Sequence, residues 1–446
     1  MMHNEHTKDK VRGGDKLSLA RLSITWAGFP FIISHTILGA VLVLKSSLIT
    51  ALSGIIIGNI LLFFYVGWLG EIGWREGRSF AQIAEVFLGK HGYKIVSGML
   101  SLLVLGWFAI NTAMPCEILS TATHYPYWIV AVILGSLFVA ITFFGIYGLN
   151  IISSISIPIY LGAIIYAFVL LSKHYVLGNV SGAIGNHQFT FAEVLTAEIA
   201  SFADSGTMAA DFNRWAKTRT ESWLSVIPAF PIANGIAGIA GALFTYELWR
   251  RGLVFNKPFQ ISNPIGYLAS IGGVGVLLAV FVSFVNQGSN AAHCLYNSAV
   301  GISKISGKSY HFITIIAGAV GIMITSSGIW SLLLSWLNII GIMVPPIGGV
   351  ILAVYLTRNI KFGLLKRLEN ANRVLAYGVD QRTIAWIGLI CGWVSGFIIS
   401  STHLKQVVPI SLGTFTVAIV ATITMIYLYK LVGRSALPIR HPGEVE

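Results

Sequence analysis

The chain has 446 residues, of which 55% are hydrophobic and only 10% are charged. Soluble domains usually carry about 25% charged residues, so this composition excludes a soluble enzyme or a soluble binding domain. The net charge is +12, but the basic residues lie in short stretches between apolar segments, which argues against a nucleic-acid surface. We expect a polytopic membrane protein in the lipid bilayer, not an enzyme, with no cofactor and no obligatory protein partner.

Apolar stretches of the length needed to cross a bilayer, about 20 residues, recur along the whole chain. Their length predicts an all-α fold, and their even number places both termini on one side of the membrane. The twelve predicted spans are 22–44, 48–70, 95–117, 126–146, 149–172, 190–212, 223–247, 268–299, 311–329, 332–356, 383–401 and 409–431.

With this topology, most of the 29 lysines and arginines fall on the side of the termini. Positive residues are retained in the cytoplasm, so we expect cytoplasmic termini in a bacterial plasma (inner) membrane. Between the second and third spans, the stretch from Arg78 to Gly92 is too short and polar to cross. Its apolar residues recur at helical spacing, which predicts an amphipathic helix on the cytoplasmic face; a solvated loop is the alternative.

Two spans contain residues that interrupt helices. The first holds Gly28 and Pro30, and the sixth holds the run Ser201–Thr207 with Gly206. Proline removes a backbone donor and glycine lowers the cost of unwinding. Paired defects at matching places are typical of transporters with two inverted five-helix repeats; a simple kink at Pro30 is the alternative. The predicted organisation is a cytoplasmic tail at 1–21, a first repeat at 22–172, a second repeat at 173–356, a cytoplasmic linker at 357–382, two further spans at 383–431 and a cytoplasmic tail at 432–446.

Carboxylates add to the polarity of the sixth span. Glu198, Asp204 and Asp211 all lie in it, and each would be costly if it faced lipid. Such a segment is tolerated only where protein or a water-filled cavity surrounds it. Asp211 stands near the predicted end of the span, so Asp204 is the strongest candidate for a site residue.

The eighth span carries a polar stripe. Asn286, Ser289, Asn290 and His293 recur at three- and four-residue spacing and therefore share one helix face. Amide and hydroxyl oxygens suit a hard monovalent cation such as sodium, together with carbonyls from an unwound first span. The alternative is that these side chains bond one helix to another.

The third span places Trp107 and Asn111 on one face. A tryptophan can stack on a flat ring while the amide bonds its edge, and Phe202 is a second stacking candidate; apolar packing is the alternative. Two buried histidines, His35 and His293, could support proton coupling, although a lone histidine in a span is usually a satisfied core residue.

Several segments together resemble the nucleobase:cation symporter-1 family, and within it the bacterial cytosine permeases. The resemblance runs from the first span to at least the tenth. It is carried by Gly106-Trp107-Phe108 in the third span, Ser201–Thr207 and Ala210–Phe212 in the sixth, Leu295-Tyr296 in the eighth, and Pro345–Ile351 with Ala353, Tyr355 and Leu356 in the tenth.

The resemblance implies five-plus-five inverted repeats with two additional C-terminal helices, working by alternating access. The substrate-binding positions that it implies are Trp107, Asn111, Ser201, Phe202, Asp204 and Ala291. The cation-binding positions that it implies are Gly28, Phe31, Asn286, Ser289 and Asn290. Two positions depart from the cytosine permeases, in which a small hydroxyl residue stands at Asp204 and an asparagine at Ala291. A carboxylate only accepts hydrogen bonds, which suits a donor-rich ring edge.

These features predict a secondary transporter that imports a nucleobase, such as a cytosine-like pyrimidine or a purine, by symport with sodium. Hydroxymethylpyrimidine, hydantoin or allantoin-like substrates, coupling to protons, and a nutrient sensor on the same scaffold are the alternatives. A channel would need a continuous polar pore, and the paired helix breaks favour an enclosed site.

Overall fold

The protein is helical throughout the residues that the structure describes. This computed structural model describes residues 6, 9–11, 13–173, 184, 188–252, 263–357 and 381–435. Within these ranges eight helical segments are long and apolar enough to cross a membrane. The described residues contain no β-sheet and form one isolated β-bridge, between Leu17 and Ala216. The protein is therefore a polytopic helical membrane protein. Nearly all of the predicted linker at 357–382 and of the tail at 432–446 lies outside the described residues.

The first half of the chain follows the predicted spans closely. Its first span is split into two helices, and each of the next four coincides with one helix. The helices are α1 (Leu19–Ala27), α2 (Ile33–Lys45), α3 (Leu48–Glu76), α4 (Phe80–Thr123), α5 (Tyr127–Phe143) and α6 (Gly145–Lys173).

The second half is more interrupted, because several predicted spans are made of two or three helical pieces. These pieces are α7 (Phe191–Thr207), α8 (Ala210–Asn213), α9 (Arg219–Leu224), the π-helix η2 (Pro228–Asn234), α10 (Gly235–Arg250), α12 (Pro264–Ser270), α13 (Val274–Ser306), α14 (Tyr310–Ser326), α15 (Leu333–Met343), α16 (Pro345–Thr357), α18 (Gln381–Ser401) and α19 (Ile410–Ser435). The predicted span at 268–299 begins too early, since α13 starts at Val274.

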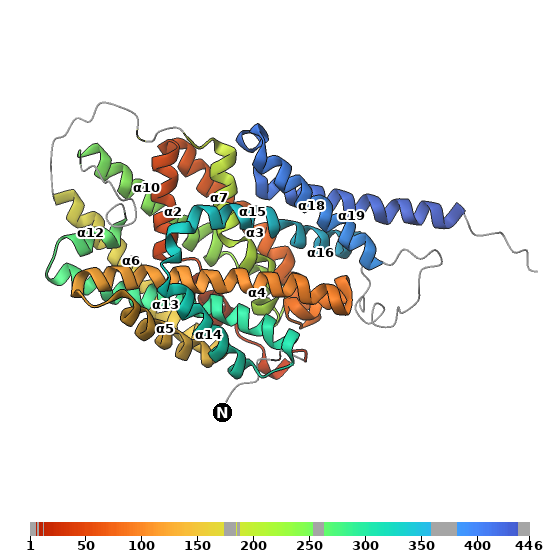
Figure 1. Ribbon diagram of the computed structural model, residues 1–446, viewed down its shortest axis with the longest axis horizontal. Helices are drawn as coiled ribbons and strands as arrows, with labels where there is room; N and C mark the ends of the chain where they lie inside the picture. Colours follow the sequence, from red (N-terminus) through yellow and green to blue (C-terminus); the bar gives the residue numbers. More distant parts are fainter. Residues whose placement is uncertain are drawn as a thin grey trace, which may run out of the picture.

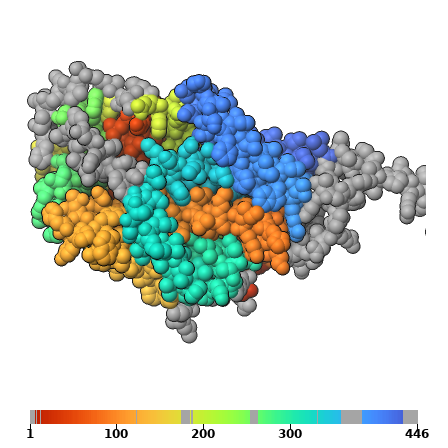
Figure 2. All heavy atoms as spheres, viewed as in Figure 1, coloured from red at the N-terminus to blue at the C-terminus, as the bar shows by residue number. Residues whose placement is uncertain are grey.

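Helices α4 and α13 lie against each other and cross the molecule together (Figure 1). This contact brings the third and eighth predicted spans, which carry the polar residues of interest, side by side. The last two helices, α18 and α19, pair with each other and rest on α16. They form one edge of the face seen in Figure 2.

The predicted interruption of the first span is confirmed. Residues 28–32 are not helical and separate α1 from α2. Pro30 cannot donate a backbone hydrogen bond, and Gly28 lies so close to α6 that a Cβ built on it would be 2.3 Å from the Cβ of Ser153. A larger residue at this position would push α6 away from the break.

The predicted unwinding of Ser201–Thr207 is wrong. Helix α7 continues through this run, and the irregular turn comes afterwards, at Met208 and Ala209. Side chains of the run bond back to their own helix: Ser201 Oγ donates to Glu198 O (2.6 Å) and Thr207 Oγ1 to Ala203 O (2.7 Å). These bonds satisfy the polar groups without breaking the helix.

The predicted amphipathic helix at Arg78–Gly92 exists as the start of α4. A capping box of Ser79 and Gln82 begins it, and Gly89, with φ of 77°, separates it from the rest of α4. Its apolar side chains, including Phe80 and Phe87, are buried in the protein core. This face therefore packs on protein, whereas a helix lying on a lipid surface would present it to the bilayer.

The N-terminal segment packs across the end of α8. Leu17 N donates to Trp215 O (2.8 Å), and Lys16 Nζ donates to Arg214 O (2.8 Å). Arg214 is fully buried, and its guanidinium donates to His6 O (3.0 Å) and to Tyr296 OH (3.3 Å). This segment closes that end of the molecule over α8 and α13.

Candidate functional site

A cavity lies where the break of the first span meets α4, α7, α13 and α15. The space between its walls, counted together with the part that is open to solvent, is about 380 Å³. The walls are mainly aromatic and aliphatic, with a few amide and hydroxyl groups. The lining residues are Phe29, Ile32, Ser34, His35, Leu38, Trp107, Asn111, Ser201, Phe202, Ser205, Asn290, Cys294, Leu333 and Leu337.

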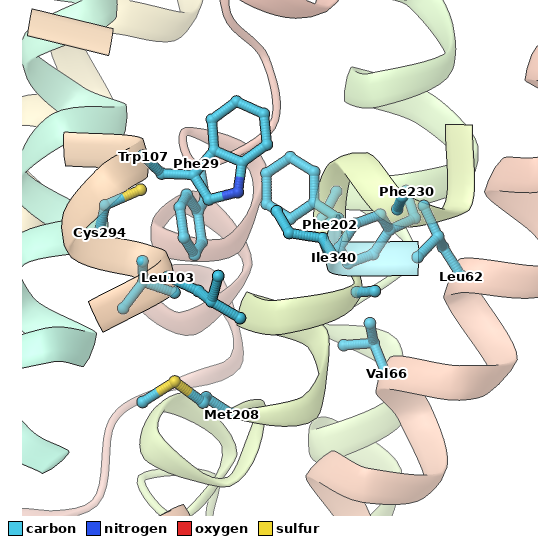
Figure 3. Packing of buried hydrophobic residues seen from close by; sticks show 14 of the residues in the cluster. Phe29, Leu62, Val66, Leu103, Trp107, Phe202, Met208, Phe230, Cys294 and Ile340 are labelled. Atoms are coloured by element: carbon cyan, nitrogen blue, oxygen red, sulfur yellow. The ribbon is translucent and has the colours of Figure 1, made fainter. Parts of the chain in front are cut away.

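Aromatic rings gather on one side of this cavity. Figure 3 shows Trp107, Phe29 and Phe202 in one group, with Cys294 nearby. The rings of Phe29 and Phe202 meet edge to face, with their centroids 5.0 Å apart. The ring centroids of His35 and Phe202 are 5.1 Å apart. Flat apolar faces of this kind can hold an aromatic or heterocyclic ring by stacking.

A chain of amide groups forms the polar side of the cavity. Ser34 Oγ donates to Asn111 Oδ1 (2.8 Å), and Asn111 Nδ2 donates to Asn290 Oδ1 (2.7 Å). Asn290 Nδ2 in turn donates to Phe29 O (2.7 Å) in the break. This relay connects α2, α4 and α13 and fixes the orientation of the two amides.

The five residues predicted to bind a cation are brought together beside this relay. Ser289 Oγ donates to Gly28 O (3.0 Å), and Asn286 Nδ2 donates to Phe31 O (2.7 Å). Asn286 is held in this orientation because its Oδ1 accepts the backbone N–H of Ile33 (2.9 Å).

Helix α6 adds a further oxygen to this corner, which sequence reasoning missed. Ser153 Oγ lies 3.3 Å from Ser289 Oγ, so two hydroxyls and the carbonyl of Gly28 are close together. Such neutral oxygens are the ligands that a hard monovalent cation prefers. Ser153 is brought here by the close contact between Gly28 and α6. That contact could not be predicted from the sequence.

Of the six predicted substrate-binding residues, four line the cavity and two do not. Trp107, Asn111, Ser201 and Phe202 are among the lining residues, and Asp204 and Ala291 are not. Successive residues of an α-helix are about 100° apart. Because α7 stays helical, Ser201, Phe202 and Ser205 share a face that leaves Asp204 to one side. Ala291 is likewise turned away from the face of α13 that carries Asn290 and Cys294.

Asp204 nevertheless lies close behind the aromatic wall. Its Oδ1 accepts the backbone N–H of Ser205 (2.7 Å), while its Oδ2 and the indole Nε1 of Trp107 are both buried and form no hydrogen bond of good geometry with the other described residues. The two side chains are close enough to interact electrostatically. Asp204 can therefore influence the orientation of Trp107 without lining the cavity.

The two predicted histidines occupy different places. His35 lines the cavity, with Nε2 3.0 Å from Ser201 Oγ. His293 lies outside the lining, with Nδ1 2.7 Å from Ser289 O and Nε2 3.0 Å from Thr25 O. Ser205 and Cys294 are further lining residues that the sequence analysis did not name. They follow Ser201 and Asn290 by four residues, a helical spacing that could have identified them.

Comparison with known proteins agrees with this arrangement. Residues 15–420 match the family model described as a permease for cytosine/purines, uracil, thiamine and allantoin. The chain belongs to this family. The nucleobase:cation symporter-1 family predicted from the sequence motifs is thereby confirmed, and the protein is a transporter rather than an enzyme.

Individual relatives give the degree of similarity. The cytosine permease of Escherichia coli K12 is 27% identical over 357 residues, covering 77% of this chain and 78% of the relative. The hydantoin permease of Microbacterium maritypicum is 24% identical over 369 residues, covering 76% of this chain and 71% of the relative.

Two solved structures share the fold. Mhp1, a nucleobase-cation-symport-1 family transporter solved in a closed conformation with bromovinylhydantoin bound, matches with a TM-score of 0.73 and 18% identity, covering 99% of this chain and 98% of the other. A Na⁺-coupled sialic acid symporter matches with a TM-score of 0.65 and 13% identity, covering 95% and 92%. The helical transporter fold predicted from the sequence is thus confirmed at this level.

Proposed function

We propose that this protein is a secondary active transporter that imports a nucleobase or a related small heterocycle together with a monovalent cation. The observation that carries the proposal is the cavity at the break of the first span. It combines the ring faces of Phe29, Trp107 and Phe202 with the amides of Asn111 and Asn290. A flat, polar-edged ring is the ligand that this combination of groups fits.

The proposed substrate is a cytosine-like pyrimidine or a purine that stacks on Trp107. Phe202 and Ser201 would face the ring from α7, and Asn111 would bond its edge. Relatives named for cytosine and for hydantoin support this substrate class. Hydantoin, allantoin-like or hydroxymethylpyrimidine substrates are the alternative, since the residues at Asp204 and Ala291 depart from the cytosine permeases.

The proposed coupling ion is sodium, bound where the break meets α13. Ser289 Oγ lies 3.0 Å from Gly28 O and 3.3 Å from Ser153 Oγ, and Asn286 and Asn290 donate to the neighbouring carbonyls. A structural neighbour described as Na⁺-coupled supports this choice. Protons are the alternative coupling ion.

The proposed architecture is that of twelve crossings in a five-plus-five inverted repeat with two additional C-terminal helices, working by alternating access. The eight long apolar segments would be joined by the four crossings made of α1/α2, α5, α7/α8 and α14. We place the protein in the bacterial plasma membrane with both termini in the cytoplasm, because most basic residues then lie inside.

A ligand screen followed by an uptake assay tests this proposal. A specific ligand stabilises the folded protein by mass action, so cytosine, uracil, hydantoin and allantoin are each added to purified protein with and without sodium, and thermal stability is measured. A ligand that raises the melting temperature is then offered to proteoliposomes with an inward sodium gradient. We expect the ligand to accumulate inside the proteoliposomes. Binding without accumulation would instead indicate a nutrient sensor on this scaffold.

A further inference from the structure

A second polar cluster lies away from the cavity, between α3, α7 and the π-helix η2. It consists of Glu198 on α7, Asn59 on α3 and Asn234, the last residue of η2, and all three are at most 1% exposed. Nothing in the transport site described above uses these residues. A carboxyl group in the apolar interior of a membrane protein is costly unless it is paired, and such residues usually have a function.

The hydrogen bonds of this cluster can be counted completely. Asn59 Nδ2 donates to Ile55 O and to Glu198 Oε1, both at 2.8 Å. Asn234 Nδ2 donates to Asn59 Oδ1 (2.8 Å) and to Glu198 Oε1 (3.1 Å). Both amide groups therefore use both of their hydrogens.

Two acceptor oxygens remain without a donor. Asn234 Oδ1 is buried and has no partner among the described residues, and no side chain or N–H of the described chain donates to Glu198 Oε2. The buried acceptor of Asn234 therefore lacks a hydrogen. A proton on Glu198 would supply it, because a protonated carboxyl donates one hydrogen bond.

We propose that Glu198, Asn59 and Asn234 form a proton-binding site, and that its protonation is coupled to substrate binding through α7. Two N–H groups stabilise the carboxylate at Oε1, and a protonated acid would have the unpartnered acceptor of Asn234 available within the same cluster. A metal ion fits less well, because the amides turn N–H groups rather than oxygens toward the carboxyl group.

Helix α7 provides the connection between this cluster and the cavity. Ser201, which lines the cavity, donates to the backbone carbonyl of Glu198 (2.6 Å) and contacts His35 Nε2 (3.0 Å). Tight contact makes the helix sensitive to the state of its carboxyl group, since a Cβ built on Gly58 of α3 would be 2.5 Å from Glu198 Cγ. A change at Glu198 would therefore move the wall that carries Ser201.

Other titratable groups face α7 and must be separated from Glu198 in any test. They are Asp204 and Glu193 on α7 itself, His35 on α2, Tyr65 on α3, and the exposed His403 and Lys405 on the 3-10 helix that follows α18. The side chains of α15 that line the cavity beside α7, Leu333 and Leu337, are uncharged. A single-residue variant at Glu198 distinguishes its contribution from theirs.

The test rests on the proposed function and compares Glu198→Gln with Glu193→Gln. Glutamine at 198 mimics the protonated acid, because its amide keeps an acceptor for Asn59 and gains a donor for Asn234. Glutamine at 193 removes a carboxyl from the same helix and preserves the N-terminal capping box with Thr190. Affinity for the stabilising heterocycle (cytosine, uracil, hydantoin or allantoin) is measured on full-length protein from pH 5.5 to 8.5.

We expect the affinity of the wild type and of Glu193→Gln to rise about tenfold from pH 8.5 to pH 5.5. The affinity of Glu198→Gln should stay constant within about twofold. The proposal is overturned if Glu198→Gln keeps the wild-type pH dependence, or if the wild type binds equally well at every pH. Failure of all four heterocycles to bind would instead refute the proposed substrate class.

A second variant keeps the test decisive if Glu198→Gln does not fold. Glu198→Asp retains a titratable carboxyl but is one methylene too short to reach both amides. Its pH midpoint for substrate binding should differ from that of the wild type by about one unit or more. An unchanged midpoint would exclude Glu198 as the proton-binding group. Uptake of protons on substrate addition, measured with a pH dye in weak buffer, checks the wild type independently.

Discussion

Replacing Ser289 with alanine tests the proposed cation site most directly. Its hydroxyl lies between a carbonyl of the break and a second hydroxyl, since it donates to Gly28 O (3.0 Å) and lies 3.3 Å from Ser153 Oγ. Alanine removes this oxygen and leaves the backbone of α13 unchanged. The change should therefore weaken cation binding without unfolding the protein.

The expected size of the effect follows from the contacts that are lost. One neutral hydrogen bond contributes about 1 kcal/mol to stability, and a buried polar group that loses its partner costs about 1–3 kcal/mol. Because the carbonyl of Gly28 loses its donor, we expect Ser289→Ala to be destabilised by about 1–3 kcal/mol. The half-saturating sodium concentration for substrate binding should rise about tenfold or more, because one of three oxygens is missing and each 1.4 kcal/mol is a factor of ten.

The assay is the sodium dependence of substrate-induced thermal stabilisation in purified protein. Ser283→Ala is the matched control, because Ser283 lies on the same helix and its buried hydroxyl has no hydrogen-bond partner within the described ranges. That control should keep the wild-type sodium dependence. Equal sodium dependence in Ser289→Ala and the wild type would refute the assignment of Ser289 to the cation site.

Three further predictions concern the cavity and the N-terminal segment. Trp107→Leu should lower substrate affinity by about 1–3 kcal/mol, the usual value of stacking a base on an aromatic ring, whereas Trp128→Leu, at an exposed position on α5, should not change binding in the same titration. Asn290→Leu leaves the carbonyl of Phe29 and one N–H of Asn111 without a partner, so we expect about 2–6 kcal/mol of lost stability, measured as a lower melting temperature. Burial and the nearby charge of Arg214 lower the pKa of Lys16 to about 8. The unfolded chain therefore binds more protons between that value and about 10.4, and wild-type stability should rise with pH across this window; Lys16→Met should remove the rise in melting curves.

Much of the fold could be predicted because a bilayer restricts the backbone so strongly. Each predicted apolar segment corresponds to one helix or to two or three helical pieces, and Gly28 with Pro30 correctly predicted the break of the first span. A proline and a glycine within one span predict a helix break from local sequence alone. This signal acts through the missing backbone donor of proline and the low cost of unwinding at glycine, and it needs no knowledge of distant partners.

Features that depend on how side chains are satisfied could not be predicted in this way. The run Ser201–Thr207 looked too polar for a helix, yet its hydroxyls bond to the carbonyls of their own turn. This kept α7 helical and turned Asp204 away from the cavity. The π-helix that ends at Asn234 was also not predicted, because its prolines, Pro228 and Pro231, are equally compatible with a simple kink.

The polar stripe of α13 and the break of the first span are best understood as one structural device. Asn286, Ser289, Asn290 and His293 each contact a different carbonyl in or just before the break. In hydrocarbon these carbonyls would otherwise have no partner, so the stripe stabilises an interruption that the membrane alone would not tolerate.

This arrangement also indicates how the break could respond to a cation. Asn286 and Asn290 donate N–H groups to carbonyls of the break, and their Oδ1 atoms already accept from the N–H of Ile33 and from Asn111 Nδ2. The hydroxyl of Ser289 can rotate, so that its oxygen and the carbonyl of Gly28 face the same point. A cation bound there would replace one hydrogen bond while the amides keep the break in place. It would thereby strengthen the link between α1 and α13, whose relative position alternating access must change.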